Sequence, residues 1–316
     1  NKVTKEYYIN DYGNQIKNFV KSVYLRIREI KYNEKFIDTK DLYPGDYIKE
    51  IAKKILKKRN TKYESLDENY DFLAKESLNY SMEMIKNDLD KLGIRHDSFI
   101  SEKSIVQKNT VTNAIKQLKK NNFVEEGFLE PPKGEENKNW KKTKRLIFKS
   151  ILFGDDANRA LQKNDGSWTY FANDLAYHFN KVSRKYDKLI NVLGADHTGY
   201  IKRIKGAVKA LSENKTILEC KVCQLVKLFK NGLPFKMSKR AGDFISVSDL
   251  LNEVNKDSIR FMMLNRNNDV ELDFDFEKVV EKTKENPVYY VQYCFARISS
   301  IFRTIKIDYE NEIKIK

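Results

Sequence analysis

Apolar residues recur along this chain with two alternating periods, one typical of strands and one typical of helices. The β-prone run 7–9 is followed by a polar turn and by apolar positions at helical spacing through residue 23. Helical spacing returns at 48–55, after the Pro-Gly pair 44–45, and the pattern stays helical and charged from 60 to 90. A strand, a turn and a helix in succession form the unit of α/β folds, so an α/β fold is predicted.

In the second half of the chain, the spacing of apolar residues changes several times between that of strands and that of helices. Short β-prone pieces separated by Pro-Pro, Gly and charge clusters predict inserted hairpins within 122–170. The α/β rhythm then returns, and we expect a helix at 171–182, an apolar strand in "KLINVLGADHTGY", a helix through residue 207 and one strand in "TILECKVCQLVKLF". Two helices after residue 246, the linker "NNDVELDFDF" and a long helix with an aromatic stripe complete the prediction.

Composition narrows the class of protein. Of the 316 residues, 41% are hydrophobic and 33% are charged, which is typical of a soluble globular protein with one large domain or two ordinary ones. The net charge of +15 favours a polyanionic partner, nucleic acid first. A general coding bias toward Lys, Asn, Ile and Tyr would raise the charge equally, so charge alone leaves both explanations open.

The cysteine content and the hydropathy indicate in which cellular compartment the protein works. Cys220, Cys223 and Cys294 suggest a reducing compartment. The lone C-x-x-C has no second pair and no nearby histidine, which favours alternating strand residues over a zinc site, and we expect no structural metal. No apolar run approaches the ~20 residues of a membrane span and no signal peptide is visible, so a cytoplasmic protein is expected.

Two segments place polar residues where α/β folds bind ligands. "VLGADHTGY" sets Gly194, Asp196 and His197 at the carboxyl end of a strand, where a carboxylate can take a ribose, although Asp196 would suit a helix cap equally well. "SWTYFANDLAYHF" sets Tyr170 and Asp174 one helical turn apart. That pair is a good receptor for a cationic side chain such as arginine, and the alternative is a solvated acid beside a core aromatic.

The loop "PFKMSKRAGD" sets two lysines around Ser238, close to a glycine and a proline that keep the backbone irregular. In so basic a chain this spacing alone is also compatible with chance.

Taken in combination, these segments resemble one family, the arginyl-tRNA synthetases, which are class I aminoacyl-tRNA synthetases. The matching stretches follow the order of the family over almost the whole chain, and the Lys-Met-Ser-Lys tetrapeptide resembles its mobile activation loop. The stretches include "VTKEYYINDYGNQI", "LYPGDYIKEIAKKI", "LFGDDANRALQKNDGSWTYFANDLAYHFNK", "LINVLGADHTGYIKRIKGAVKAL", "PFKMSKRAGDFISVSDLL" and "NPVYYVQYCFARISSIFR".

The resemblance implies a fold and a domain order. We expect a Rossmann-like parallel sheet with helical and hairpin insertions at 1–275, with the insertion around 100–168, and the start of an all-helical anticodon-binding domain at 276–316. The family's His-x-Gly-His helix and N-terminal domain are missing, and the first residue is Asn1 instead of Met. These departures predict a chain cut at both ends that is inactive alone.

The resemblance also implies roles for single residues. Asn10, Asp11 and Gln15 match a family segment near the ligands, although turn and cap roles suit them equally. The expected site residues are Tyr170, Asp174 and His197 for arginine; Gly194, Asp196, His197, Met237 and Lys239 for ATP; and Lys236 and Lys239 for catalysis.

The implied activity is that of an arginine–tRNA ligase acting on L-arginine, ATP with Mg²⁺ and tRNA(Arg), as a monomer. One alternative is a non-ligating relative that binds arginine, ATP or tRNA. A dinucleotide-dependent oxidoreductase is disfavoured because no G-x-G-x-x-G follows a strand. A plain basic RNA-binding module would explain the charge and leave Tyr170, Asp174 and the lysine loop without a purpose.

Replacing Lys239 by alanine in a length-restored enzyme should slow arginine activation far more than it weakens ATP binding. Negative charge grows on the leaving pyrophosphate mainly in the transition state, so the lysine acts there. Loss of one such contact typically costs ~3–4 kcal/mol, or two to three orders of magnitude in rate. Steady-state kinetics measure both effects. An unchanged activation rate with only a higher KM for ATP would mean that the loop binds ATP and does not stabilise the transition state.

Overall fold

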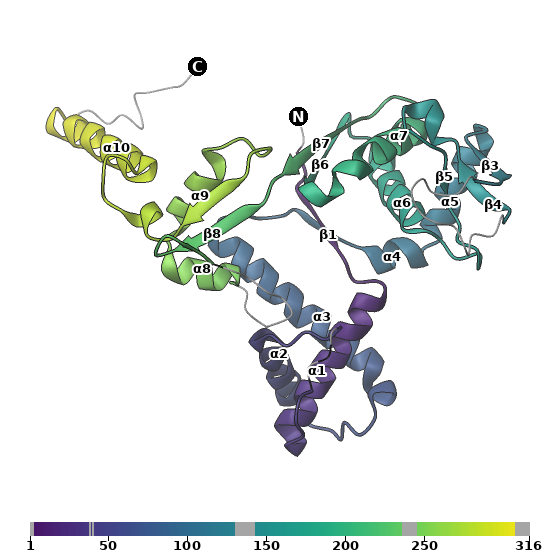
Figure 1. The fold of residues 1–316 in the computed structure, drawn as a ribbon, viewed down its shortest axis with the longest axis horizontal. Helices are drawn as coiled ribbons and strands as arrows, with labels where there is room; N and C mark the ends of the chain where they lie inside the picture. The colour runs from purple at the N-terminus through teal and green to yellow at the C-terminus, as the bar shows by residue number, and fades with distance from the viewer. Residues whose placement is uncertain (1–2, 38, 40, 130–142, 236–244, 307–316) are drawn as a thin grey trace. The chain divides into compact units, whose positions relative to one another are not determined.

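The structure is a computed structural model that describes residues 3–37, 39, 41–129, 143–235 and 245–306 (Figure 1). The chain divides into two compact units, and each unit combines two separate stretches of sequence. Unit 1 holds residues 1–16 and 96–224, and unit 2 holds residues 17–95 and 225–316. The expected domain boundary at residue 275 stays a prediction.

Unit 1 contains most of the strands and the helices that flank them. Its elements are β1 (Glu6–Ile9), β2 (Ser98–Ser101), α4 (Glu102–Gln107), α5 (Thr110–Lys120), β3 (Val124–Gly127), β4 (Arg145–Phe148), η1 (Ser150–Phe153), β5 (Arg159–Ala160), α6 (Tyr170–Ser183), β6 (Lys188–Gly194), η2 (Ala195–Tyr200), α7 (Ile201–Ser212) and β7 (Ile217–Cys223).

Unit 2 is mainly helical, with one small sheet. Its elements are α1 (Asn14–Tyr32, whose first turn belongs to unit 1), α2 (Asp46–Lys58), α3 (Leu66–Lys91), β8 (Val226–Lys230), β9 (Leu233–Pro234), α8 (Val247–Glu253), α9 (Lys256–Leu264), β10 (Leu272–Asp275), η3 (Lys278–Val280) and α10 (Pro287–Thr304).

Strand pairing confirms the predicted fold class. Three pairs of strands are parallel: β1 with β2, β6 with β7, and β8 with β10. The inserted hairpins are also confirmed, because β3 pairs with β4 and β4 with β5 in antiparallel register. Parallel neighbours need crossover connections, and the helices supply them.

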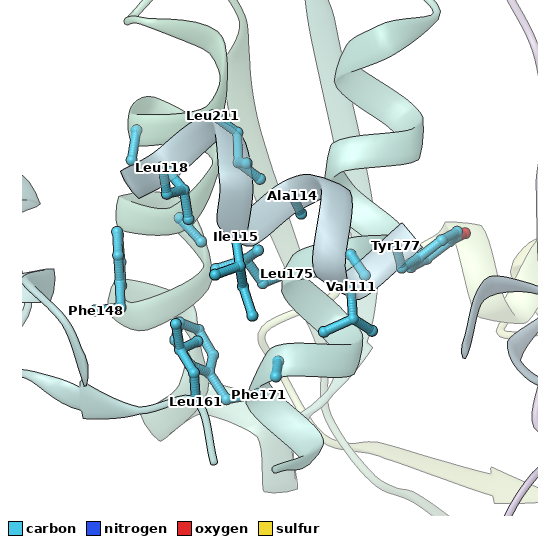
Figure 2. Close-up of a cluster of buried hydrophobic side chains, with 14 of the residues drawn as sticks. Val111, Ala114, Ile115, Leu118, Phe148, Leu161, Phe171, Leu175, Tyr177 and Leu211 are labelled. Carbon is cyan, nitrogen blue, oxygen red and sulfur yellow. The ribbon is translucent and has the colours of Figure 1, made fainter. Parts of the chain in front are cut away.

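The core of unit 1 forms where α5, α6 and α7 pack together (Figure 2). Helix α6 begins at Tyr170, and Oγ1 of its N-cap residue Thr169 accepts a hydrogen bond from the Ala172 backbone N–H. Helical spacing then carries Phe171 and Leu175 into the core, and Leu175 has no exposed surface. One face of α6 therefore packs in the core, and this packing fixes the direction of the opposite face.

A close approach brings α7 onto η1. A Cβ atom at Gly206 would lie 3.2 Å from Cβ of Phe153, so only glycine fits there without displacement. Phe153 in turn stacks on the fully buried Phe148 with the ring centroids 5.7 Å apart.

Two details of the sequence interpretation were wrong. The run "TILECKVCQLVKLF" is two strands, β7 and β8, because pairing with β6 ends at Cys223 and the following strand pairs with β10 in unit 2. The expected linker "NNDVELDFDF" contains β10. Its buried Leu272 and Phe274 alternate with acids, a period of two that predicts a strand.

Replacing Leu175 by alanine should lower the free energy of unfolding by about 2–5 kcal/mol, because a fully buried side chain leaves a cavity among α5, α6 and α7. The matched control is Leu152→Ala in the same unit, where the leucine is 65% exposed and the change should stay within about 0.5 kcal/mol. Urea unfolding followed by circular dichroism measures both, and equal effects would contradict the assigned core.

Candidate functional site

A cavity of about 1250 Å³ lies within unit 1. Its walls come from β1 and the turn after it, the start of α4, the loop at 163–168, helix α6, strand β6 and η2. The three residues expected to bind arginine, Tyr170, Asp174 and His197, all line this cavity. Residues from separate elements therefore meet at one site.

Helix α6 supplies the largest share of polar groups to the cavity. Tyr170, Asp174, His178 and Lys181 follow one another at intervals of four, four and three residues, and all four line the cavity. This spacing places them on one face of the helix, opposite the face that packs in the core.

The carboxylate of Asp174 is the best-defined polar group of the site. It accepts a hydrogen bond of 2.6 Å from the hydroxyl of Tyr200. Burial raises the pKa of Asp174, against the opposing effects of that hydrogen bond and of the positive charges of His197 and Lys181. No ion pair reaches this carboxylate within the described part of the chain, so a partly buried acid is left with one hydrogen-bond partner among those residues.

Glu102 is a site residue that the sequence analysis missed. It is the first residue of α4 and lines the same cavity. Burial raises the pKa of Glu102 to about 7, with further contributions from the negative charges of Asp174 and Asp11. In sequence, Ser101 and Glu102 form an ordinary helix start, and only the tertiary structure brings this acid close to α6.

Of the tyrosines that line the cavity, Tyr170 is not the one that bonds Asp174. The hydroxyl that bonds Asp174 belongs to Tyr200, whereas Tyr170 is 81% exposed and has Lys163 Nζ 5.7 Å from its ring centroid.

Tyr8 stacks on Tyr177 with the centroids 3.9 Å apart, and its buried hydroxyl has no hydrogen-bond partner among the described residues. Tyr8 therefore has a hydroxyl that remains free to donate.

The turn after β1 shows two kinds of role. Asn10 and Gln15 line the cavity and share a hydrogen bond of 3.1 Å. Asp11 accepts hydrogen bonds from Ser101 Oγ at 2.6 Å and from the Lys103 backbone N–H at 2.9 Å. Asp11 thus ties the end of β1 to the start of α4.

Gly194 and Asp196 lie at the carboxyl end of β6 and are not among the residues that line the cavity. The Asp196 side chain is 82% exposed, and its Oδ2 lies 3.6 Å from His197 Nε2. A Cβ atom at Gly194 would lie 2.6 Å from Oδ1 of Asp196, so this exposed side chain would have to move to admit any other residue. Lys236, Met237 and Lys239 lie outside the described residues.

Neither a candidate metal centre nor a membrane-spanning helix occurs in the described ranges. No group of three or more His, Cys, Asp or Glu side chains there could hold a metal ion, and the three cysteines are free thiols. Of the helices described, none combines the length and apolar character that crossing a bilayer requires.

Comparison with known proteins adds independent information. The family model described as "tRNA synthetases class I (R), catalytic domain" matches residues 1–302. The chain is 58% identical over 319 residues to the arginine–tRNA ligase of Pelagibacter ubique, covering 99% of this chain and 55% of that protein. It is 47% identical to the arginine–tRNA ligase of Wolbachia pipientis, covering 96% and 53%. The chain spans about half the length of these curated relatives.

Solved structures agree with the sequence relatives. A crystal structure from Campylobacter jejuni, described as an arginyl-tRNA synthetase, has a TM-score of 0.81 and 34% identity, covering 98% of this chain and 64% of that one. The arginyl-tRNA synthetase of Thermus thermophilus has a TM-score of 0.63 at 18% identity, covering 96% and 58%, which shows a shared fold alone. Because the family model covers nearly the whole chain, the protein belongs to the class I arginyl-tRNA synthetase family, within its catalytic domain.

Proposed function

We propose that this chain forms the catalytic part of an arginine–tRNA ligase. In that reaction an arginine carboxylate oxygen bonds to the α-phosphorus of ATP and pyrophosphate leaves. A terminal hydroxyl of tRNA(Arg) then attacks the arginyl carbonyl and AMP leaves. The observation that carries the proposal is the partly buried Asp174 carboxylate, which has no ion-pair partner in the described residues and lies in a cavity of a family member.

Asp174 is proposed to hold the guanidinium group of arginine. A partly buried carboxylate with a raised pKa is stabilised when a cation enters, because the cation favours the ionised form. Glu102 adds a second acid to the same cavity, although the whole chain carries a net charge of +15. Glu6 is the third acid of the lining, and Lys163 and Lys181 are its lysines. This excess of acids over lysines favours a cationic ligand over an anionic one. Tyr170 and His197 are proposed to complete the arginine site, since both line the cavity.

ATP is proposed to bind with Mg²⁺ next to the arginine site. Gly194 and Asp196 stand at the carboxyl end of β6, where α/β sheets bind ligands, and they are proposed to contact the ribose. Met237 is proposed to lie by the adenine. Lys236 and Lys239 are proposed to stabilise the leaving pyrophosphate, since phosphoryl chemistry relies chiefly on positioned cations.

The net charge of +15 supports a polyanionic partner, here tRNA(Arg). A cytoplasmic location is proposed, since the bacterial relatives share the activity of charging tRNA.

Arginine-dependent exchange between ATP and pyrophosphate tests the proposed function. The enzyme for this test is a chimera in which this chain replaces the matching part of the Pelagibacter ubique relative, assayed with tRNA present. Exchange that requires arginine supports a ligase. Tight binding of arginine and ATP without exchange would favour the non-ligating alternative instead.

Replacing Asp174 by asparagine in the chimera should raise the KM for arginine by at least about a hundredfold. The amide cannot neutralise a guanidinium, and breaking one partner of a desolvated ion pair costs on the order of 3–5 kcal/mol. The KM for ATP should hardly change. The matched control is Asp257→Asn, an exposed acid in the first turn of α9, whose effect should stay within about 0.5 kcal/mol. Equal, small effects of both substitutions would remove Asp174 from the arginine site.

Arginine should bind the chimera more tightly at pH 8 than at pH 6. Burial and the neighbouring acids raise the pKa of Glu102 to about 7, so this group is largely neutral at pH 6 and gains its negative charge as the pH rises through 7. Glu102→Gln should remove this difference, because the amide does not titrate. Calorimetry at both pH values measures it, and an identical pH dependence in the variant would exclude Glu102 as its source.

A further inference from the structure

A chain of hydrogen bonds runs along the wall of the cavity, from Lys181 to the backbone of Asp174. Lys181 Nζ donates to Asn191 Oδ1 at 3.0 Å. Asn191 Nδ2 lies 2.9 Å from Nε2 of His178, and Nδ1 of His178 lies 2.8 Å from the main-chain carbonyl oxygen of Asp174. His178 is 4% exposed, so both of its ring nitrogens rely on these partners.

The direction of each hydrogen bond follows from which of its two groups can donate a proton. A lysine ammonium has only donors, so the amide of Asn191 must turn its oxygen toward Lys181 and its NH₂ group toward His178. Nε2 of His178 is then an acceptor and carries no proton. The proton of the neutral ring therefore sits on Nδ1 and is donated to the Asp174 carbonyl.

We propose that His178 is a positioning residue for Asp174, with Asn191 and Lys181 fixing its tautomer. The carbonyl of Asp174 already accepts the helical hydrogen bond from the backbone of residue 178, and the imidazole donates a second one to the same oxygen. Because Asn191 belongs to β6, this chain of hydrogen bonds through Lys181, Asn191 and His178, called the relay below, also ties this turn of α6 to the strand. The arginine part of the inference rests on the proposed function.

The charge state of the relay suits a site for a cation. Burial lowers the pKa of His178 to about 3, with a further lowering from the positive charge of Lys181. The ring thus stays neutral and adds no positive charge one turn from Asp174. The charged groups that act on it are Lys181 on its own helix and Glu6 on β1. Glu6 is itself held by Tyr177 and Arg184.

The tautomer can be observed directly, without any assay of activity. The chain has three histidines, so long-range proton–nitrogen NMR of histidine-labelled protein resolves them, and His178→Leu identifies the signal. Burial lowers the pKa of Lys181 to about 8, so this lysine is still charged at pH 7. We expect His178 to carry its proton on Nδ1 from pH 5 to pH 7. Asn191→Asp removes the donor and should protonate Nε2, whereas the same change at the exposed Asn113 of α5 should leave His178 as it was. A proton on Nε2 in the wild-type protein would overturn the relay.

Kinetics of the chimera separate positioning from packing. His178→Asn keeps a donor near the place of Nδ1, whereas His178→Leu keeps a volume closer to that of histidine and loses the donor. Loss of one buried hydrogen bond corresponds to about tenfold, so Leu should raise the KM for arginine about tenfold and Asn less than about threefold, with the KM for ATP unchanged in both. Leu performing as well as Asn would mean that His178 merely fills space, and overturns the proposal. A wild-type chimera that ignores arginine would overturn the proposed function and this role with it, while the NMR result would still decide the tautomer.

Discussion

The packing of α6 is the constraint on which the site depends. Phe171 and Leu175 hold one face of this helix in the core of unit 1, and helical geometry then has to present Asp174, His178 and Lys181 to the cavity. The helix is fixed from the other side as well, because Asn191 of β6 bonds to both His178 and Lys181. A carboxylate carried on an element held from both sides keeps its direction, which is what selective binding of a guanidinium requires.

The cavity is lined by several acids, although the chain as a whole carries a net positive charge. The protein is strongly basic, yet burial raises the pKa values of both Asp174 and Glu102. Keeping two such acids near each other costs stability unless a cation shares the site. The structure thus combines a positive overall charge, which suits a nucleic acid, with a local acidic cavity, which suits the proposed amino acid.

The site is also a product of how distant segments pair. Strand β1 lies parallel to β2, with Glu6 opposite Ser98, although the helical segment 17–95 separates them in sequence. Hydrogen bonds from Ser101 and Lys103 to Asp11 then fasten the turn after β1 to the start of α4. This pairing brings Tyr8 and Glu102 to one cavity, and no local pattern in either segment indicates the other.

The sequence by itself determined the fold class and the face of α6, because helical periodicity and strand periodicity are local properties of the chain. The spacing of Tyr170 and Asp174 was enough to place both on one side of a helix, and both line the cavity. The sequence did not determine that Tyr200 is the residue that bonds Asp174, that Asp174 is close enough to raise the pKa of Glu102, or that residues 216–229 divide between two units. Those facts depend on burial and on contacts between segments far apart in sequence, and a pKa or a hydrogen bond exists only once the tertiary structure has removed water and brought the partners together.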